Sequence, residues 1–297
     1  MDRPKTARKQ DRLIQTYTKP QSTLSRALKH TGFVTGMAIV LTLIFCAVVS
    51  VFWSPYPVAD IDIPNKLASP SAAHWLGTDS LGRDIASLLW VGSQNTLLVG
   101  LIAVGIGLSV GVPLGLLASA KRGWVEEVIM RASDFTFAFP ALLSAILLTA
   151  IYGPGLVISI TAIGIFNIPV FARVTRGAAN DIWTRDYTLA AMAPGKSKWT
   201  ITWNHVLPNM ASVLIVQASV QFAIAILAEA ALSYLGLGTQ APQPSWGRML
   251  NEAQSQMFQA PMLAVYPGIA IALAVLGLNL MGDGLRDLLD PRLSRSR

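Results

Sequence analysis

Charged residues are scarce in this chain of 297 residues. Only 13% of the residues are Asp, Glu, Lys or Arg, against about 25% in soluble domains, while 53% are hydrophobic. This shortage excludes an ordinary soluble protein. The mean hydropathy of +0.50 also excludes a disordered chain, which needs low hydrophobicity and high charge. Most of the surface therefore has to face lipid or other helices.

Cysteine and histidine are also rare. Cys46 is the single cysteine, which excludes a disulfide within the chain. The three histidines, His30, His74 and His205, are too far apart in the sequence to indicate a metal site. The residues therefore predict neither a metal nor a cofactor bound by this chain.

What the chain has instead is long stretches without Asp, Glu, Lys or Arg. A helix that spans a bilayer needs roughly 20 mostly apolar residues, and five stretches are long enough. Gly153-Pro154-Gly155 divides the third stretch, because a helix interior tolerates such a run poorly. We therefore expect an all-α, polytopic membrane protein with six transmembrane helices. The expected spans are residues 32–53, 97–120, 135–152, 156–172, 211–234 and 263–281.

Positive residues are distributed unevenly between the loops. Twenty of the 23 Lys and Arg residues lie in segments 1–31, 120–137, 173–210 and 282–297, and three lie in the loops of the other side. The positive-inside rule places the basic loops and both termini in the cytoplasm. The net charge of +7 is therefore explained by topology, and nucleic acid is not an expected partner. The first span should remain as an anchor, because it is longer than the apolar core of a signal peptide.

Two short motifs match functional patterns but lack the required context. Ala190–Ser197 approximates a phosphate-binding loop, but its first glycine is missing and no strand precedes it. Gly107–Gly111 matches a hydrolase nucleophile motif, but it lies inside an apolar span with no His or Asp nearby. Gly107, Gly111 and Gly115 recur every four residues, which favours close packing of helices instead.

The longest basic loop has the pattern of a folded unit. Apolar residues follow a helical spacing over 183–193 and again over 199–206. Pro194-Gly195 separates the two helices, and Pro208 is expected to end the second. Such a helix–turn–helix with exposed aromatic residues could rest on the membrane surface or dock into a partner, and composition leaves both interpretations open.

Several motifs along the chain resemble those of a known family. The motif Asp186-Tyr187-Thr188-Leu189-Ala190-Ala191, followed by Gly195 and by His205-Val206-Leu207-Pro208-Asn209, resembles the coupling loop of binding-protein-dependent ABC importer permeases. Three further segments resemble the C-type permease of dipeptide, oligopeptide and nickel importers. They are residues 74–84, residues 229–238, and residues 282–287 together with Asp290-Pro291-Arg292.

The resemblance implies a type I ABC importer permease fold. Its domain would cover residues 94–283, between a periplasmic segment at 54–93 and a cytoplasmic tail at 284–297. In a bacterial inner membrane, the chain would form half of a translocation pore together with a homologous second permease. An extracytoplasmic substrate-binding protein would deliver a peptide or a related small solute. Two ATP-binding subunits, which hold ATP and Mg²⁺, would drive transport, so this chain would not itself be an enzyme.

The resemblance also assigns roles to individual residues of the loop. Contact with the ATPase is implied for Leu189, Ala190, Ala191, Gly195, His205, Leu207 and Pro208. The family usually has Glu where this chain has Leu189 and Leu where it has Pro194. The acidic contact expected at the ATPase surface is therefore missing. We expect the shape of the loop to maintain docking instead, because its small residues permit close approach of the backbone to the ATPase.

The outer segment at 54–93 contains four prolines, which predict an irregular structure. Asp79, Arg83 and Asp84 then have helical spacings, and Asp79 is expected to cap the helix that leads into the second span. These residues would either stabilise the structure locally or form part of an outer gate or a dock for the binding protein. Trp246 in the next outer loop has the same two interpretations.

Polar residues form one face of the fifth expected span. Gln217, Gln221 and Glu229 are spaced by multiples of four residues. An ionised side chain at the bilayer centre costs roughly 2.5–3.5 kcal/mol, so such a residue should face protein or water rather than lipid. This face could therefore line a translocation pathway or form hydrogen bonds between helices. We predict a pathway role for the two glutamines. For Glu229, near the end of the span, we favour hydrogen bonding or hydration.

The rival interpretation is a self-sufficient secondary transporter or channel. Such a protein carries its own ion-coupling residues near the membrane midplane. The expected spans contain no Asp, Lys or Arg. The sequence therefore favours a subunit driven from outside the chain, and it does not identify the substrate.

Overall fold

The computed structural model describes residue 27 and residues 30–193 and 195–289. Among these residues, the regular structure is helical apart from one isolated antiparallel bridge between Thr78 and Asp84. The all-α class is therefore confirmed. Outside the described residues lie nearly all of the basic segment 1–31, Pro194, and the tail from residue 290 with its Asp-Pro-Arg motif.

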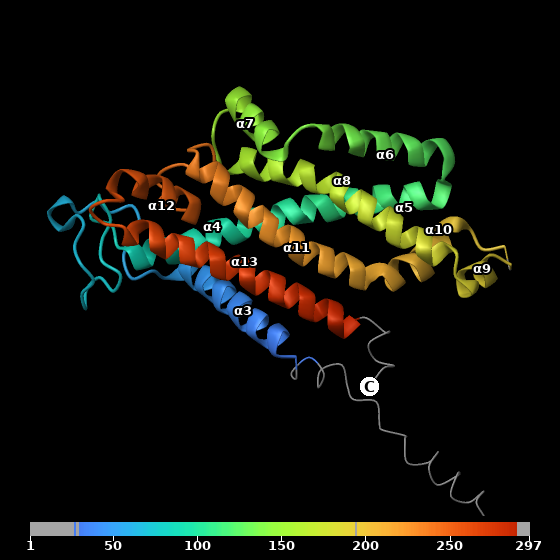
Figure 1. Cartoon of the computed structure of the whole chain (residues 1–297), viewed down its shortest axis with the longest axis horizontal. Helices are drawn as coiled ribbons and strands as arrows, with labels where there is room; N and C mark the ends of the chain where they lie inside the picture. The colour runs from blue at the N-terminus through green and yellow to red at the C-terminus, as the bar shows by residue number, and fades with distance from the viewer. Residues whose placement is uncertain (1–26, 28–29, 194, 290–297) are drawn as a thin grey trace, which may run out of the picture.

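Long apolar helices form the elongated bundle of Figure 1. Five are long and apolar enough to cross a membrane, and the bent pair α6 and α7 brings the number to the expected six if the two helices together form one span. The five are α3 (Thr31–Phe52), α4 and α5 (Ile85–Ile106 and Val112–Lys121, joined by a π turn at Gly107–Gly111), α8 (Leu156–Trp183), α10 and α11 (Lys198–Ile201 and Leu207–Tyr234, joined by a π turn at Thr202–Val206), and α13 (Met262–Leu289).

Two short helices mark the ends of the bundle. Helix α9 (Asp186–Met192) lies beside α10 at one end, which we call the basic end. Helix α12 (Trp246–Ala253) lies at the other end, which we call the far end, together with the loops between α3 and α4 (Figure 1). Helix α13 packs mainly against α3 and α11 and extends beyond its expected limit to Leu289.

The third expected span is broken rather than straight. Helices α6 (Gly123–Ala138) and α7 (Ala141–Tyr152) meet at an angle of 80°. The break falls at Phe139, which has an extended backbone, and Pro140, which disfavours a helical conformation in the residue before it. The expected single helix over 135–152 is therefore wrong, because Pro140 interrupts it well before the Gly-Pro-Gly run further along the chain.

Charged side chains hold α6 along α8. Arg176 of α8 donates from Nε to Glu126 of α6 at 2.6 Å, and Arg173 pairs with Asp134. The guanidinium of Arg173 also lies 4.5 Å from the ring centre of Phe137. These ion pairs explain how a helix that carries several charges remains part of the bundle.

The helix that leads into the second span begins at Ile85, well before the expected start of the span at Leu97. The carboxylate of Asp84 caps this helix by accepting a hydrogen bond from the backbone N–H of Ser87 at 2.8 Å. The polar residues at 93–96, which placed the start of the span at Leu97, are buried except for the half-buried Gln94. Asn95, for example, donates from Nδ2 to the carbonyl of Pro244 at 2.7 Å. Polar side chains with protein partners do not mark the end of a span.

Each of the two composite helices contains a π turn that ends two residues before a proline. A proline removes one backbone hydrogen bond and clashes with the carbonyl four residues earlier. For Pro113 and Pro208 that carbonyl belongs to Ser109 and Asn204, which lie in the π turns, and the wider turn accommodates the proline ring. The expectation that Pro208 ends a helix is therefore wrong. The helix continues from Lys198 to Tyr234.

The glycine stripe packs directly against α8, as predicted. A Cβ atom at Gly111 would lie 2.4 Å from the carbonyl oxygen of Ile168. One at Gly115 would lie 2.4 Å from the carbonyl oxygen of Ala172. No side chain fits at these distances, so the glycines set how closely the two helices approach.

Candidate functional site

The predicted coupling loop forms the tip of the basic end (Figure 1). Gly195 lies between α9 and α10 with a backbone φ of +81°, in the left-handed region. A Cβ atom there would have no neighbour within 4 Å. Its conformation, rather than a contact within this chain, therefore requires glycine. Ser197 begins α10 by accepting a hydrogen bond from the N–H of Thr200 at 3.2 Å.

Large apolar side chains are exposed on this tip. We call them the coupling surface, which consists of Tyr187, Leu189, Met192, Trp199 and Trp203. An exposed apolar patch of this kind marks a site that another protein or a membrane covers. The predicted helix over 183–193 begins only at Asp186, because Trp183 still belongs to α8.

The seven predicted coupling residues fall into two groups. Leu189, Ala190, Ala191 and Gly195 lie together at the tip, and all but the half-buried Ala191 are exposed. The other three, His205, Leu207 and Pro208, lie at the π turn and at the start of α11. The second part of the motif is thus part of a membrane-length helix rather than of a loop.

Buried residues join the coupling surface to the bundle. Ile201, Val206 and Met210 are fully buried and pack in one apolar cluster with Trp183 and Ile182 at the end of α8. Because α10 continues into α11, this cluster connects the tip to a helix of 37 residues that reaches the far end. The tip, the end of α8 and the start of α11 are therefore packed together.

The predicted polar face of α11 divides into separate environments. Gln221 is buried and donates from Nε2 to Oδ1 of Asn167 on α8 at 2.9 Å. In this structure the Gln221 side chain is used in packing between helices, which favours the hydrogen-bonding alternative over the predicted pathway role. Gln217 is only partly buried, and its predicted role stays a prediction.

Glu229 is completely buried, with an exposed fraction of 0%. Its Oε1 accepts hydrogen bonds from the hydroxyls of Ser233 at 2.6 Å and Thr239 at 3.3 Å. The N–H of Thr239 also donates to Ser233 Oγ at 2.9 Å. Glu229 therefore fastens the turn that follows α11. The side chain is enclosed by protein in this structure.

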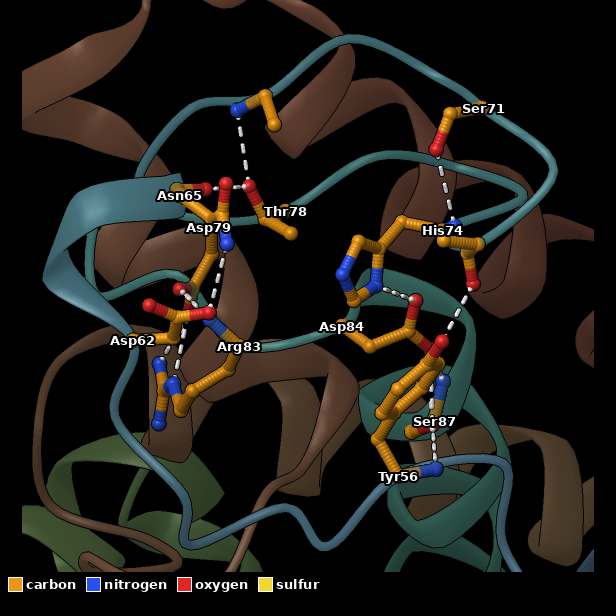
Figure 2. Close-up of polar contacts among 12 residues, drawn as sticks. Tyr56, Asp62, Asn65, Ser71, His74, Thr78, Asp79, Arg83, Asp84 and Ser87 are labelled. Atoms are coloured by element: carbon orange, nitrogen blue, oxygen red, sulfur yellow. Dashed lines mark hydrogen bonds and ion pairs between the residues drawn. The ribbon is translucent and has the colours of Figure 1, made fainter.

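Asp79 does not cap a helix, contrary to the expectation. One carboxylate oxygen accepts from the backbone N–H groups of Leu81 at 2.8 Å and Arg83 at 2.9 Å, which closes a tight turn. The contacts between Asp79 and Arg83 are drawn in Figure 2. The four-residue spacing of Asp79 and Arg83 comes from this turn. Asp84 provides the helix cap instead.

Arg83 connects the outer segment to α12. Its Nε donates to Asp79 at 2.7 Å, and its Nη2 lies 2.5 Å from Glu252, which also accepts from Arg248 at 2.7 Å. Burial by itself would lower the pKa of Arg83, but the carboxylates of Asp79 and Glu252 outweigh it and raise the pKa. Glu252 was not among the predicted site residues, although its spacing from Arg248 on one helix indicated a pair.

His74, Asp84 and Tyr56 form a second polar cluster nearby (Figure 2). His74 Nδ1 lies 3.0 Å from one oxygen of Asp84, while Ser87 donates to the other oxygen from N and Oγ at 2.8 Å. The hydroxyl of Tyr56 donates to the carbonyl of Ala73 at 2.9 Å, and its ring packs against His74. These contacts give the proline-rich segment before α4 a defined structure, although its only regular elements among the described residues are a 3-10 turn at Ile63–Asn65 and the bridge between Thr78 and Asp84.

Trp246 is a packing residue in this structure. Its exposed fraction is 1%, and Nε1 donates to the carbonyl of Leu89 on α4 at 3.0 Å. Asp79, Arg83 and Asp84 are buried as well. Buried side chains cannot touch a docked protein, so local stabilisation explains these residues better than a binding-protein dock. In the described part of the chain, no cluster of three or more His, Cys, Asp or Glu could hold a metal ion.

Comparison with solved structures supports the fold. A chain of the MetNI methionine ABC transporter, solved in inward-facing conformations, superposes with a TM-score of 0.57. The match covers 68% of this chain and 96% of that chain, at 18% identity. At this identity the similarity concerns the fold alone.

Comparison of sequences identifies the family. The glutathione transport system permease protein GsiD of Pectobacterium atrosepticum is 44% identical over 89% of this chain and 88% of its own length. The dipeptide transport system permease protein DppC of Alkalihalophilus pseudofirmus is 40% identical over 88% and 86%. A family model for the inner membrane component of binding-protein-dependent transport systems matches residues 111–295. This chain therefore belongs to that family, the ABC importer permeases.

Proposed function

We propose that this chain is one of two permease subunits of an ATP-driven importer for a short peptide or a peptide-like solute such as glutathione. Relatives with those substrates in their names match nearly 90% of the chain at 40–44% identity. The permease subunit itself is not an enzyme, and ATP hydrolysis takes place on separate chains. The rival interpretation as a self-sufficient transporter is not favoured, because the named relatives are components of larger transport systems.

In this proposal the basic end faces the cytoplasm of a bacterial cell and carries both termini. Two ATP-binding subunits with ATP and Mg²⁺ meet the chain there, and an extracytoplasmic substrate-binding protein meets the far end. A homologous second permease completes the pore. The charge distribution of the loops supports this orientation, since Lys and Arg favour the cytoplasmic side.

The observation that carries the proposal is the coupling surface at the end of a continuous helix. Trp199 lies on α10 and Trp203 in the π turn that leads into α11. When the ATPases close, a subunit bound to these residues would move α8 and α11 as one body, because the buried cluster below the tip connects them. Gln217 on α11 remains the candidate for contact with the transported solute.

Gly195→Asp tests this function. The left-handed φ at Gly195 makes any side chain unfavourable, and a charge there would face the bound ATPase. We expect fewer ATPase chains to copurify, or ATP hydrolysis to continue without uptake, while the permease still inserts into the membrane. The measurements are subunit recovery after purification in mild detergent and uptake of a labelled dipeptide or glutathione.

Gly123→Asp is the matched control. Gly123 also has a positive φ, of +61°, also has open space around its Cα, and lies at the basic end outside the coupling surface. It therefore reproduces the backbone strain and the added charge. Normal ATPase recovery together with normal uptake in Gly195→Asp would refute the proposal.

A further inference from the structure

An open groove of about 250 Å³ lies at the far end, next to the end of α3. Its lining includes the aromatic residues Trp53, Tyr56 and Trp75, together with Ala73 and the charged residue Asp84. The proposed coupling of ATPase closure to the helices uses none of these side chains and therefore does not explain the groove.

The position of the groove is at the edge of the membrane. Trp53 directly follows the last residue of α3, and its exposed fraction is 54%. Trp75 is exposed by 63%. Tryptophan concentrates at the level of the lipid headgroups, where its ring contacts both apolar and polar groups. The groove thus opens where a headgroup would be.

An exposed apolar stripe on α3 leads up to the groove. It consists of Leu41, Phe45, Val48 and Phe52, which are separated by four, three and four residues and so share one face of the helix. Acyl chains that lie along this stripe would bring a headgroup to Trp53. This continuity distinguishes a lipid from a soluble peptide, which has no acyl chain to place on α3.

The chemistry of the lining selects a cation. Aromatic faces attract an ammonium group by their quadrupole. The carboxylate of Asp84 is buried and already hydrogen-bonded, so it adds negative potential to the groove without touching the ligand. His74 and Ser87 hold that carboxylate in place (Figure 2). We propose that the groove binds the ammonium group of an ethanolamine phospholipid whose acyl chains lie along α3.

The test uses the full chain purified with its partner subunits, stripped of lipid and measured by native mass spectrometry. Dioleoyl phosphatidylethanolamine and dioleoyl phosphatidylglycerol are added in equal amounts, and we expect the first to be retained preferentially. Trp75→Ala should weaken this retention about 2- to 5-fold, which corresponds to the loss of one exposed cation–π contact. Trp75→Phe keeps an aromatic face and should retain most of the binding.

Two controls check that retention depends on this groove and on the ammonium group. Trp124→Ala removes a Trp that is also exposed, at the basic end, and should leave retention unchanged. Phosphatidylethanolamine with an acetylated amine should bind no better than phosphatidylglycerol. Equal retention of the two unmodified lipids, or unchanged retention in Trp75→Ala, would overturn the proposal. Displacement of the lipid by a dipeptide with a free amino group would assign the groove to the substrate instead.

Discussion

Individual polar side chains within the spans of this chain form hydrogen bonds with other protein groups. Gln221 reaches Asn167 on another helix, and Glu229 accepts from two hydroxyls near the far end. Each would cost free energy in lipid without such partners. Both residues therefore contribute to the arrangement of the helices, although their four-residue spacing predicted a single polar face toward a pathway.

Gln221→Leu should lower the stability of the chain clearly and change its transport activity little. The substitution removes the donor to Asn167 and leaves its buried amide without a partner, and hydrogen bonds between membrane helices average about 0.6 kcal/mol. Gln217→Leu, on the partly buried side of the same helix, should change uptake while stability is kept. Unfolding in detergent and uptake by reconstituted complexes measure the two effects. Lower uptake with unchanged stability in Gln221→Leu would restore the pathway interpretation.

Gly111→Ala should destabilise the chain, because the new methyl group would meet the carbonyl oxygen of Ile168. Overpacking of this kind costs about 1–3 kcal/mol. Gly105→Ala, in the same helix but with open space around it, should be neutral or stabilising by up to about 1 kcal/mol. Thermal unfolding of the two variants measures the contrast. Equal stability of both would show that the glycine stripe does not set the distance between α5 and α8.

Among the helices, the sequence predicted the number of crossings better than their shapes. Long uncharged stretches are sufficient to find α3, α8, α11 and α13. The break at Phe139 and the π turns depend on local backbone geometry around prolines, which hydropathy does not register. The helix that leads into the second span was predicted, but its capping residue is Asp84 rather than Asp79, and the partner of Asn95 lies in a loop about 150 residues away in the chain.

The link between the outer segment and α12 depends on Arg83. Removal of this buried guanidinium leaves the carboxylate of Asp79 without its cation, while Glu252 keeps Arg248, and breaking a buried pair costs roughly 3–5 kcal/mol. We expect Arg83→Ala to lower the unfolding temperature and to make residues 54–84 accessible to protease. Arg248→Ala removes a more exposed partner of Glu252 and should have a smaller effect. Equal effects of the two variants would contradict the central role of Arg83.

At the scale of the whole molecule, the candidate sites differ in how far the sequence could reveal them. The coupling loop is a local motif, and the structure brings its first part together at the tip. The far end is different, because Arg83 and Glu252 are 169 residues apart and their contact follows only from the packing of α4 against α12. The groove beside Trp53 lies within the one segment between α3 and the start of α4, but it forms only when that segment folds back on itself, so no local pattern predicts it.

Orientation in the membrane can be tested with single cysteines in a Cys46→Ser background. Ser71 and Ser255 are exposed at the far end, and Ser197 is exposed at the basic end. Because 20 of the 23 Lys and Arg residues lie in the basic segments, we expect cysteines at the first two positions to react with a membrane-impermeant thiol reagent in intact cells. A cysteine at Ser197 should react only after the cells are opened. Ser245, in the same outer loop as Ser255, is buried as the cap of α12 and would give no signal from either side. Labelling at Ser197 in sealed cells would reverse the orientation and place the coupling surface away from the ATPases.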